Sequence, residues 1–288
     1  MRSARQPGEL ERRPRAVAVG TFDGVHLGHR RVVEAVIATG LTPTVVTFDP
    51  HPRTVLGNRV EMISTLERRL ELLAELGIED ILVVEFTLEL AQLTAEEFAG
   101  AYLGAIGAEV VAAGASFRFG RGRGGDLDLL RRLGFDARDV PPLQGVSSSL
   151  VRRLIAAGEV ERAAASLGRP VEVEGLVVAG DQRGGTLGFP TANLAVAADL
   201  LVPAYGIYAG AAGEHRAAVS IGVNPHYGGE ERRVEAFLLE FEGDLYGRRL
   251  VVELWRHLRE ERAFGSESEL VEQIARDVAE TRAATRPV

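Results

Sequence analysis

Two histidines stand three positions apart in a glycine-rich segment, residues 20–29, which reads GTFDGVHLGH. Gly24 and Gly28 have no side chain, so an anion can approach the backbone, and His26 and His29 can both donate hydrogen bonds to it. If the segment joins a strand to a helix, the free N–H groups of the first helical turn also point at that anion. The pattern predicts a site for transfer at phosphorus, which needs positioned charge rather than a protein nucleophile.

Two different interpretations of this segment compete with the phosphate site. One is an ordinary glycine-rich turn that carries two surface histidines. The other is a zinc site, but the chain has no cysteine and no obvious carboxylate at ligand spacing from the histidines. The complete stretch, following a strand, favours the phosphate site over both.

A second glycine-rich segment, residues 180–193, reads GDQRGGTLGFPTAN. Glycines around a turn can form a backbone cradle for phosphates. Thr191 and Asn193 are two positions apart, so in a strand they bring two neutral oxygens to one side, which together with ATP oxygens and water suits Mg²⁺. A plain β-turn is the competing interpretation for the glycines alone. The attached residues 187–193 favour a nucleotide and Mg²⁺ site.

Glu235 is an acidic residue at the start of a largely apolar, strand-like stretch, residues 234–241. A carboxylate in such a strand can face a cavity and accept a proton as a general base. The competing interpretation is a solvated glutamate at the edge of a sheet.

The first half of the chain alternates between strand-like and helix-like segments. Strands are expected at residues 15–20, 42–48, 81–86 and 109–113, and helices at 28–36, 66–76, from 95 onward, 150–157 and 160–167. Ser64 with Glu67, and Thr94 with Glu97, have the spacing of capping boxes. Strands that alternate with helices imply a parallel sheet with helices on its faces.

The pattern changes after Gly168-Arg169-Pro170, which breaks the chain. Strands are expected at residues 171–179, 205–212, 216–221, 234–241 and 250–258. A last helix opens at Ser266 and Glu269, with Leu270, Ile274 and Val278 on one face. Short strands at this spacing predict a small antiparallel barrel. We therefore expect two domains, residues 1–168 and 169–288.

The charged side chains exclude some functions. The 288 residues carry a formal net charge of -8, so the surface as a whole repels a phosphate backbone and nucleic acid is not expected as a partner. All 33 basic residues are arginine, because the sequence contains no lysine. A P-loop that depends on its lysine is excluded, and any phosphate must be held by arginine, histidine, backbone N–H groups or a metal ion.

Further features of the composition concern the location of the protein. The absence of cysteine excludes disulfides and thiol catalysis and fits a reducing cytoplasm. The first fifteen residues are rich in arginine, but no apolar segment follows, so we expect a solvated tail rather than a signal peptide. No apolar run approaches the length of a membrane span. We expect a cytoplasmic protein that does not bind membranes.

The first glycine-rich segment is part of a set of motifs that resembles a known superfamily. Residues 20–29 resemble the His-x-Gly-His nucleotidyltransferases, in the form found in the adenylyltransferase module of bacterial FAD synthetases. Similar motifs are FDPHP at residues 48–52, FRFG at 117–120 and VSSSLVR at 146–152. The resemblance implies a Rossmann-like domain that transfers the adenylyl group of ATP to FMN.

The same resemblance implies roles for single residues. His26 and His29 would be catalytic. ATP would be bound by Gly20, Phe22, Asp23, Gly24, His26, Gly28, His29, Ser147, Ser148 and Arg152. The flavin would be bound by Phe48, Asp49, Phe117 and Arg118.

The second half resembles a riboflavin kinase domain over nearly its full length. The resemblance rests on residues 180–193 and on GIYA at 206–209, SIGVNP at 220–225, VEAFLL at 234–239, DLYG at 244–247 and LRE at 258–260. It implies that Glu235 takes the proton from the ribityl 5′-hydroxyl and that Thr191 and Asn193 hold Mg²⁺. ATP would be bound by Gly180, Arg183, Gly184, Gly188, Pro190, Thr191 and Asn193, and the flavin by Arg259 and Phe264.

Together the resemblances imply that riboflavin and ATP give FMN in one domain, and that FMN and ATP give FAD and pyrophosphate in the other. Ser116 and Leu150 depart from the adenylyltransferase pattern, and Gly185 and His226 from the kinase pattern. They motivate a competing hypothesis, a kinase with a degenerate adenylyltransferase half. A transferase for another phosphorylated vitamin and a non-catalytic flavin-binding protein are two more hypotheses. Homo-oligomer formation, kinetic constants, flavin redox preference and channelling stay open.

Overall fold

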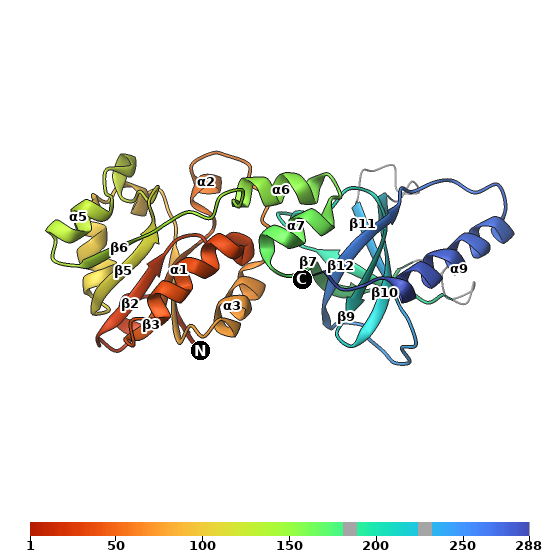
Figure 1. Ribbon diagram of the computed structural model, residues 1–288, viewed down its shortest axis with the longest axis horizontal. Coiled ribbons are helices and arrows are strands. Elements are labelled where there is room, and N and C mark those ends of the chain that lie inside the picture. The colour runs from red at the N-terminus through yellow and green to blue at the C-terminus, as the bar shows by residue number, and fades with distance from the viewer. Residues whose placement is uncertain (181–188, 224–231, 288) are drawn as a thin grey trace. The chain divides into compact units, whose positions relative to one another are not determined.

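The computed structural model describes residues 1–180, 189–223 and 232–287 and divides into two compact units, Met1–Ser148 and Ser149–Val288 (Figure 1). Within the described residues, no helix has the length and apolar character needed to cross a membrane. The first unit contains, in chain order, β1 (Arg2–Ala4), η1 (Pro7–Glu9), β2 (Arg15–Val19), η2 (Asp23–Val25), α1 (Leu27–Ile37), β3 (Thr42–Asp49), α2 (Pro52–Val55), α3 (Leu66–Glu75), β4 (Asp80–Glu85), η3 (Leu90–Gln92), α4 (Ala95–Phe98), η4 (Ala99–Gly104), β5 (Ala108–Gly114), η5 (Arg121–Arg123), α5 (Leu127–Arg132) and β6 (Asp136–Val140).

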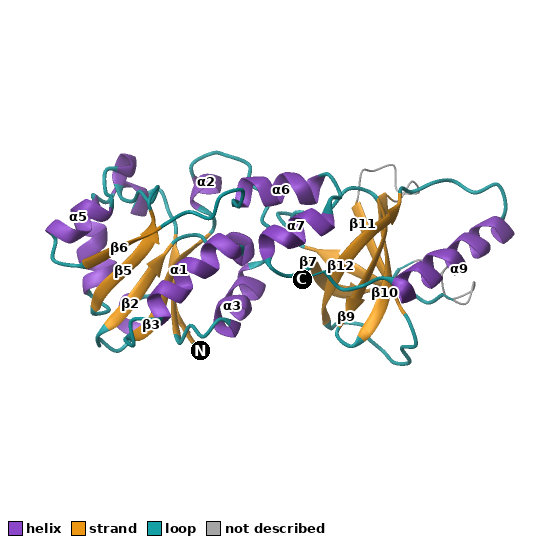
Figure 2. Cartoon of the chain, in the orientation of Figure 1, coloured by secondary structure: helices purple, strands orange, loops and turns teal. Residues whose placement is uncertain are grey.

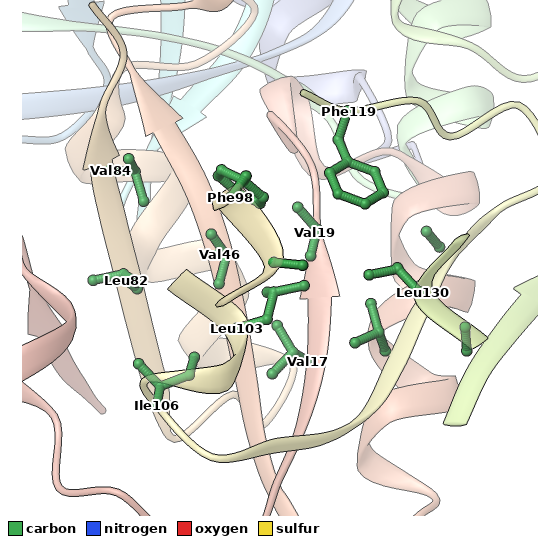
Figure 3. Packing of buried hydrophobic residues seen from close by; sticks show 14 of the residues in the cluster. Val17, Val19, Val46, Leu82, Val84, Phe98, Leu103, Ile106, Phe119 and Leu130 are labelled. Atoms are coloured by element: carbon green, nitrogen blue, oxygen red, sulfur yellow. The ribbon is translucent and has the colours of Figure 1, made fainter. Parts of the chain in front are cut away.

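The strands of the first unit form one six-stranded parallel sheet in the order β1-β4-β3-β2-β5-β6. Successive side chains of a strand point to opposite faces, so each strand contributes to two cores. On one face Val17, Val19 and Val46 pack with Phe98 and Leu103 of the α4–η4 segment (Figure 3). Helices α1 and α3 cover the other face. The predicted parallel sheet with helices on its faces is confirmed.

The N-terminal segment is not the solvated tail that its arginine content suggested. Strand β1 pairs with β4 at the edge of the sheet, and Leu10 is buried. Asp80, at the start of β4, accepts hydrogen bonds from three guanidinium groups, those of Arg2, Arg13 and Arg15. The arginines therefore neutralise one buried carboxylate, a tertiary contact that composition does not reveal.

Replacing Asp80 by Asn should strongly destabilise the first unit. The side chain of Arg15 is 0% exposed and that of Asp80 is 4% exposed, so the amide would leave a buried guanidinium without its counter-charge. Removing one partner of a buried ion pair costs about 3–5 kcal/mol, which we expect as the loss in free energy of unfolding in urea at pH 7. As a matched control, Asp136→Asn removes a pair in which both side chains are about half exposed. That change should cost less than about 1 kcal/mol.

The free energy of unfolding measured at decreasing pH gives a second check on the role of Asp80. Burial alone would raise the pKa of Asp80, but the hydrogen bonds from Arg15, Arg13 and Arg2 outweigh it and hold the pKa below its ordinary value. The carboxylate therefore stabilises the fold above the unfolded-state pKa of about 3.9, and this contribution is lost as pH falls through the folded-state pKa. The gap between wild type and Asp80→Asn should shrink over that range. A gap that stays constant into acid would contradict this role.

The second unit is a barrel with helices. It contains α6 (Ser148–Ala156), whose first residue ends the first unit, α7 (Val160–Leu167), β7 (Val171–Val178), β8 (Ala192–Val196), β9 (Gly206–Ala212), β10 (His215–Val223), β11 (Arg232–Leu238), β12 (Arg249–Arg259) and α9 (Glu267–Ala283). Six strands close an antiparallel barrel in the order β10-β11-β8-β7-β12-β9. The predicted small antiparallel barrel is confirmed (Figure 2), although β8 was not among the expected strands. Val234, Ala236 and Leu238 of β11 are buried, so by alternation Glu235 belongs to the outer face.

Helix α9 packs on the outer face of β9 and β10 (Figure 1). Its N-cap is Ser266, whose hydroxyl accepts the N–H of Glu269, as the sequence predicted. At its other end, Arg216 of β10 donates to the carbonyl oxygens of Thr281 and Ala284. A helix leaves its last carbonyls without internal partners, so Arg216 both caps the helix and ties it to the barrel.

The compact units divide at residues 148 and 149, whereas the chain break suggested a boundary near residue 168. Helix α7 packs against β7 and β12, so the helical segment before the break groups with the barrel. The assignment of residues 1–168 and 169–288 to two catalytic domains stays a prediction.

Candidate active sites

The first glycine-rich segment, residues 20–29, follows β2 and leads through η2 into α1. In the sheet, β2 lies between β3 and β5. The chain runs from β2 to β3 and β4 on one side, and then returns to β5 on the other. Such a reversal leaves a crevice beyond the carboxyl ends of the strands, where open α/β sheets bind ligands. The segment therefore has the strand-to-helix context that a phosphate site requires.

His26 and His29 lie face to face at the start of α1. Their rings are stacked, with centroids 3.6 Å apart and an interplanar angle of 13°. His26 Nδ1 accepts the backbone N–H of His29 at 3.2 Å. Because Nδ1 is the acceptor, we assign the proton of neutral His26 to Nε2, where it can be donated to an anion. The two imidazoles and the first N–H groups of α1 thus meet at one helix N-terminus.

Two glycines of this segment are required because neighbouring side chains leave no room for a β-carbon. A β-carbon on Gly28 would lie 3.1 Å from the His26 ring, and one on Gly24 would lie 2.7 Å from Ile63. Gly24 also has a φ of 74°, which glycine adopts most readily. Both glycines therefore set the backbone path of the segment as well as leaving it open to an anion. Gly20, also predicted for ATP, directly follows β2, and a β-carbon there would touch the Phe22 ring at 3.3 Å.

Residues 63 and 64, in the loop before α3, hold the first glycine-rich segment in place. The buried carboxylate of Asp23 accepts the backbone N–H groups of Ile63 and Ser64, the shortest at 2.9 Å. Ser64 Oγ in turn accepts the N–H of Gly24 at 3.1 Å. Asp23 and Phe22 are both buried, and their predicted contact with ATP stays a prediction beside this structural role.

The capping box predicted from Ser64 and Glu67 is wrong by one residue. Thr65 caps α3 by accepting the N–H of Arg68. Ser64 is instead engaged with Gly24, a contact across forty residues that local spacing cannot reveal. The second predicted box, formed by Thr94 and Glu97, is confirmed.

Arg69 is a residue of this site that sequence reasoning missed. Arg69 lies on α3 and its side chain is buried. Its Nη1 atom donates to the carbonyl oxygens of Thr21 at 2.9 Å and Phe48 at 3.2 Å. Thr21 belongs to the first glycine-rich segment, and Phe48 lies near the end of β3. Arg69 therefore holds the first glycine-rich segment, residues 20–29, in place beside β3, the strand that carries the predicted flavin residue Phe48.

Aromatic side chains gather near the ends of β3 and β4. Phe48 meets Phe86 and Phe98, with centroids 5.8 and 6.1 Å apart. Phe98 also meets Phe119 at 5.8 Å, and Phe117 stacks on Phe119 at 5.3 Å. Two predicted flavin residues, Phe48 and Phe117, thus belong to one continuous aromatic cluster. Phe86, which sequence reasoning missed, belongs to it as well.

The remaining predicted residues of the first site lie on loops and at a helix start. Asp49 is half-buried, 3.6 Å from Arg5, and exposed Arg118 donates to the carbonyl oxygen of Phe117. Ser147 and Ser148 directly follow Val146, whose side chain reaches within 4.0 Å of a β-carbon built on Gly28. The segment is therefore next to the start of α1. Arg152 lies on α6, in the second unit, and its role toward ATP stays a prediction.

The second unit contains a cavity of about 590 Å³ on the outer face of the barrel, under α9. This size is within the range of pockets for small organic ligands. Apolar side chains from β9 to β11 and from α9 line much of it, and a few polar groups join them. The lining includes Phe189, Thr191, Ile207, Ser220, Glu235, Phe237, Arg259, Glu261, Phe264, Leu270 and Ile274.

Thr191 and Glu235 line this cavity, and Asn193 lies beside Glu235 on the neighbouring strand. Glu235 of β11 pairs directly with Asn193 of β8, so their side chains share one face. Thr191 Oγ1 donates to Glu235 Oε2 at 3.1 Å. A β-carbon on Gly180 would lie 2.2 Å from the Asn193 amide, so a side chain at Gly180 would collide with it. The two predicted oxygen ligands and the predicted base are therefore neighbours, and Glu235 is not a solvated strand-edge residue.

Arg233 is a partner of Glu235 that sequence reasoning missed. Its Nη1 atom donates to Glu235 Oε1 at 3.1 Å, while Thr191 donates to the other carboxylate oxygen. Arg233 and Glu235 are two positions apart on β11, so both belong to its outer face. The carboxylate is held at both oxygens.

A smaller cavity of about 220 Å³ shares Thr191 with the larger one. Pro190, predicted for ATP, lines it together with Phe241, Asp244 and Tyr246. Three further predicted ATP residues, Arg183, Gly184 and Gly188, lie outside the described residues, as do Gly185 and His226.

Arg259 and Phe264, the predicted flavin residues, both line the larger cavity. Arg259 Nε and Nη2 donate to the carboxylate of Asp277 on α9, at 3.0 and 2.7 Å. The guanidinium groups of Arg259 and Arg262 lie 5.8 and 5.0 Å from the centre of the Phe264 ring. Arg259 therefore ties α9 to the end of β12, and direct contact with a flavin stays a prediction.

Two family models match the chain, one on each unit. The model described as FAD synthetase matches residues 9–150, and the one described as riboflavin kinase matches residues 167–285. Proteins called bifunctional riboflavin kinase/FMN adenylyltransferase are similar over nearly the whole chain. The one from Listeria monocytogenes is 36% identical over 93% of this chain and 92% of its own length, and that from Bacillus subtilis is 35% identical over 92% and 90%.

The chain belongs to this bifunctional family. The Escherichia coli member is 35% identical over 91% of this chain and 90% of its own length. Because the two family models cover the two units, the family favours two activities over a kinase with a degenerate second half. It equally favours them over a transferase for another vitamin and over a non-catalytic flavin-binding protein.

One solved structure that is similar to this chain carries a different name from the curated relatives given above. A Streptococcus pneumoniae chain described as a macrolide-efflux protein is 30% identical, with a TM-score of 0.88 over 97% of this chain and 98% of its own. The riboflavin kinase and FAD synthetase models match this chain directly, so we derive its function from them.

Proposed function

We propose that this chain makes FMN from riboflavin in its barrel unit and FAD from FMN in its parallel-sheet unit, using one ATP in each step. The observation that carries the proposal is the contact between Thr191 and Glu235 at a large, mostly apolar cavity, with Asn193 beside Glu235 on the neighbouring strand. Such a cavity suits a ring system, and the cluster supplies a base and two oxygen ligands. Membership of the bifunctional family supports both activities.

In the kinase step, the 5′-hydroxyl of riboflavin attacks the γ-phosphorus of ATP. The bond from phosphorus to the new oxygen forms, the bond to the β,γ-bridging oxygen breaks, and ADP leaves. Glu235 accepts the hydroxyl proton, and the hydrogen bonds from Thr191 and Arg233 hold its carboxylate in place. Most of the acceleration comes from orienting the two substrates and stabilising charge.

The residues at this site fit Mg²⁺. Thr191 and Asn193 offer neutral oxygens, and the room beside Gly180 accommodates the Asn193 amide. Within the described residues, no group of three or more His, Asp or Glu side chains could hold a metal ion by itself. Mg²⁺ usually keeps several waters and binds to few protein groups together with substrate phosphates, so the two neutral oxygens of Thr191 and Asn193 suit it. When bound, it would neutralise the negative charge of the ATP phosphates.

We propose that ATP lies across Thr191, with its adenine in the smaller cavity and its γ-phosphate toward Glu235. Phe241 and Tyr246 line the smaller cavity and can contact a purine, and Asp244 can accept a hydrogen bond from its amino group. The flavin ring would then occupy the larger cavity, among Phe237, Phe264 and the apolar face of α9.

In the adenylyl step, a phosphate oxygen of FMN attacks the α-phosphorus of a second ATP, and pyrophosphate leaves. The nucleophile is already an anion, so no protein base is needed. His26, His29 and the N–H groups at the start of α1 would stabilise the charge on the α-phosphate and on the leaving group. The flavin would stack in the aromatic cluster around Phe48 and Phe117.

Incubation of the pure protein with riboflavin, ATP and Mg²⁺, followed by chromatography of the flavins, tests both activities. We expect FMN first and then FAD with an equal amount of pyrophosphate, and no product when EDTA replaces Mg²⁺. FMN without FAD would support a degenerate adenylyltransferase half. The absence of both products would refute the proposal.

We propose the cytoplasm as the location, because the substrates are ATP and riboflavin and the chain contains no cysteine to be affected by a reducing compartment. Small molecules, rather than nucleic acid or membranes, are the proposed partners. Detection of the protein in a secreted or membrane fraction of its cells would contradict this location.

A further inference from the structure

Glu261 is a second carboxylate of the large cavity and has no role in the proposed mechanism. It lies between β12 and α9 and lines the cavity together with Glu235. On β10, Ser220 pairs directly with Glu235, and Gly222 is two positions further on the same face. A β-carbon on Gly222 would lie 2.0 Å from Glu261 Oε1. The carboxylate therefore occupies the space that a side chain at position 222 would fill.

The charged groups near Glu261 are engaged with different partners. Arg259 donates to Asp277 through Nε and Nη2 and to the carbonyl oxygen of Glu260 through Nη1. Arg262 donates to the Gln273 amide oxygen. Between the residues that the structure describes, we find no hydrogen bond to the Glu261 carboxylate. Its oxygens are thus available to a molecule in the cavity.

The pKa of Glu261 is shifted in the direction expected for a carboxylate in this cavity. Burial raises the pKa of Glu261, Arg259 lowers it, and the charge of Glu235 raises it, so that it lies above its ordinary value. Donors supplied by a bound molecule would offset both the burial and the repulsion by Glu235.

The chemistry of the substrate identifies those donors. If the 5′-hydroxyl of riboflavin reaches Glu235, the remaining ribityl hydroxyls, on the adjacent carbons, lie next to it. Ser220 and Glu261 are polar groups of the cavity lining, whereas Ile207, Leu270 and Ile274 are apolar and suit the ring. We propose that Glu261 accepts hydrogen bonds from the ribityl hydroxyls, and that Gly222 provides the space for its carboxylate. This inference rests on the proposed kinase function.

Kinase kinetics of Glu261→Ala in the full-length protein test the inference. Loss of a hydrogen bond to a charged group weakens substrate binding, so we expect the riboflavin KM to rise about tenfold or more. The kcat should stay within about threefold of wild type. Lumiflavin, which has the ring but no ribityl chain, should inhibit FMN formation with an unchanged Ki. Glu260→Ala, at an exposed neighbour outside the cavity lining, is the control and should leave all three constants unchanged.

Gly222→Ala provides a second, independent variant. Its methyl group would displace the Glu261 carboxylate, so the riboflavin KM should rise in the wild-type background but hardly change in the Glu261→Ala background. This non-additivity is the signature of a shared interaction. Equal effects of Gly222→Ala in both backgrounds, an unchanged riboflavin KM in Glu261→Ala, or equal losses for lumiflavin and riboflavin would overturn the inference. Failure of the wild type to form FMN would instead refute the proposed function itself.

Discussion

The Glu235→Gln variant should lose FMN formation by about a hundredfold to ten-thousandfold in kcat, the usual contribution of a positioned general base. Glutamine keeps the shape of the side chain, its single oxygen can accept from Arg233, and its NH2 group can donate to the Thr191 hydroxyl, so the barrel should remain folded. What it loses is the ability to take the proton from the 5′-hydroxyl. Initial rates of FMN formation from riboflavin, ATP and Mg²⁺ measure the loss directly.

Two comparisons make the Glu235 result specific. Glu214→Gln, at an exposed residue between β9 and β10, is the matched control and should form FMN at the wild-type rate. When FMN is supplied, Glu235→Gln should form FAD normally, because the residues proposed for that step are elsewhere. A variant that keeps most of its FMN formation would show that another group accepts the proton.

The His29→Ala variant should lose FAD formation from FMN by about a hundredfold to a thousandfold in kcat, as when one preorganised donor is removed from a transition state. His29 stacks on His26 and supplies the N–H that Nδ1 of His26 accepts. The backbone N–H survives the change to alanine, so His26 should keep its orientation. The measured effect would then report the imidazole of His29 itself. Pyrophosphate release with FMN and ATP as substrates gives the rate.

FMN formation from riboflavin should be unaffected by His29→Ala. His215→Ala is the control, because this histidine is in the barrel, beside Phe241, and is not part of the proposed adenylyl site. It should leave FAD formation unchanged. If His29→Ala forms FAD at the wild-type rate, the phosphates of ATP must be held by different groups.

Local patterns in the sequence predicted most of the fold. The β-branched residues of β3 and the caps at Thr94 and Ser266 act over short distances, so spacing alone reveals them. Strand β6 was missed, because three of its five residues, DARDV, are charged and it becomes a strand through pairing with β5. Strand β1 was missed because its arginines are held by Asp80, on a strand far along the chain.

The sites were predictable where the chemistry lies in contiguous motifs. His26, His29, Thr191, Asn193 and Glu235 come from such runs, and the structure brings each set together. The supporting residues were not predictable, since their function depends on tertiary neighbours. Arg69 reaches two carbonyl oxygens of the first site from α3, and the Glu261 carboxylate occupies space that Gly222 on β10 leaves.

The central claim is that one chain holds two independent active sites, and mixing the two inactive variants tests it most directly. From riboflavin, ATP and Mg²⁺, Glu235→Gln alone should form little FMN or FAD, and His29→Ala alone should accumulate FMN. Combined in one vessel, the two should form FAD, because FMN released by His29→Ala is a substrate for the intact adenylyl site of Glu235→Gln. A mixture that forms no more FAD than either variant alone would contradict the claim.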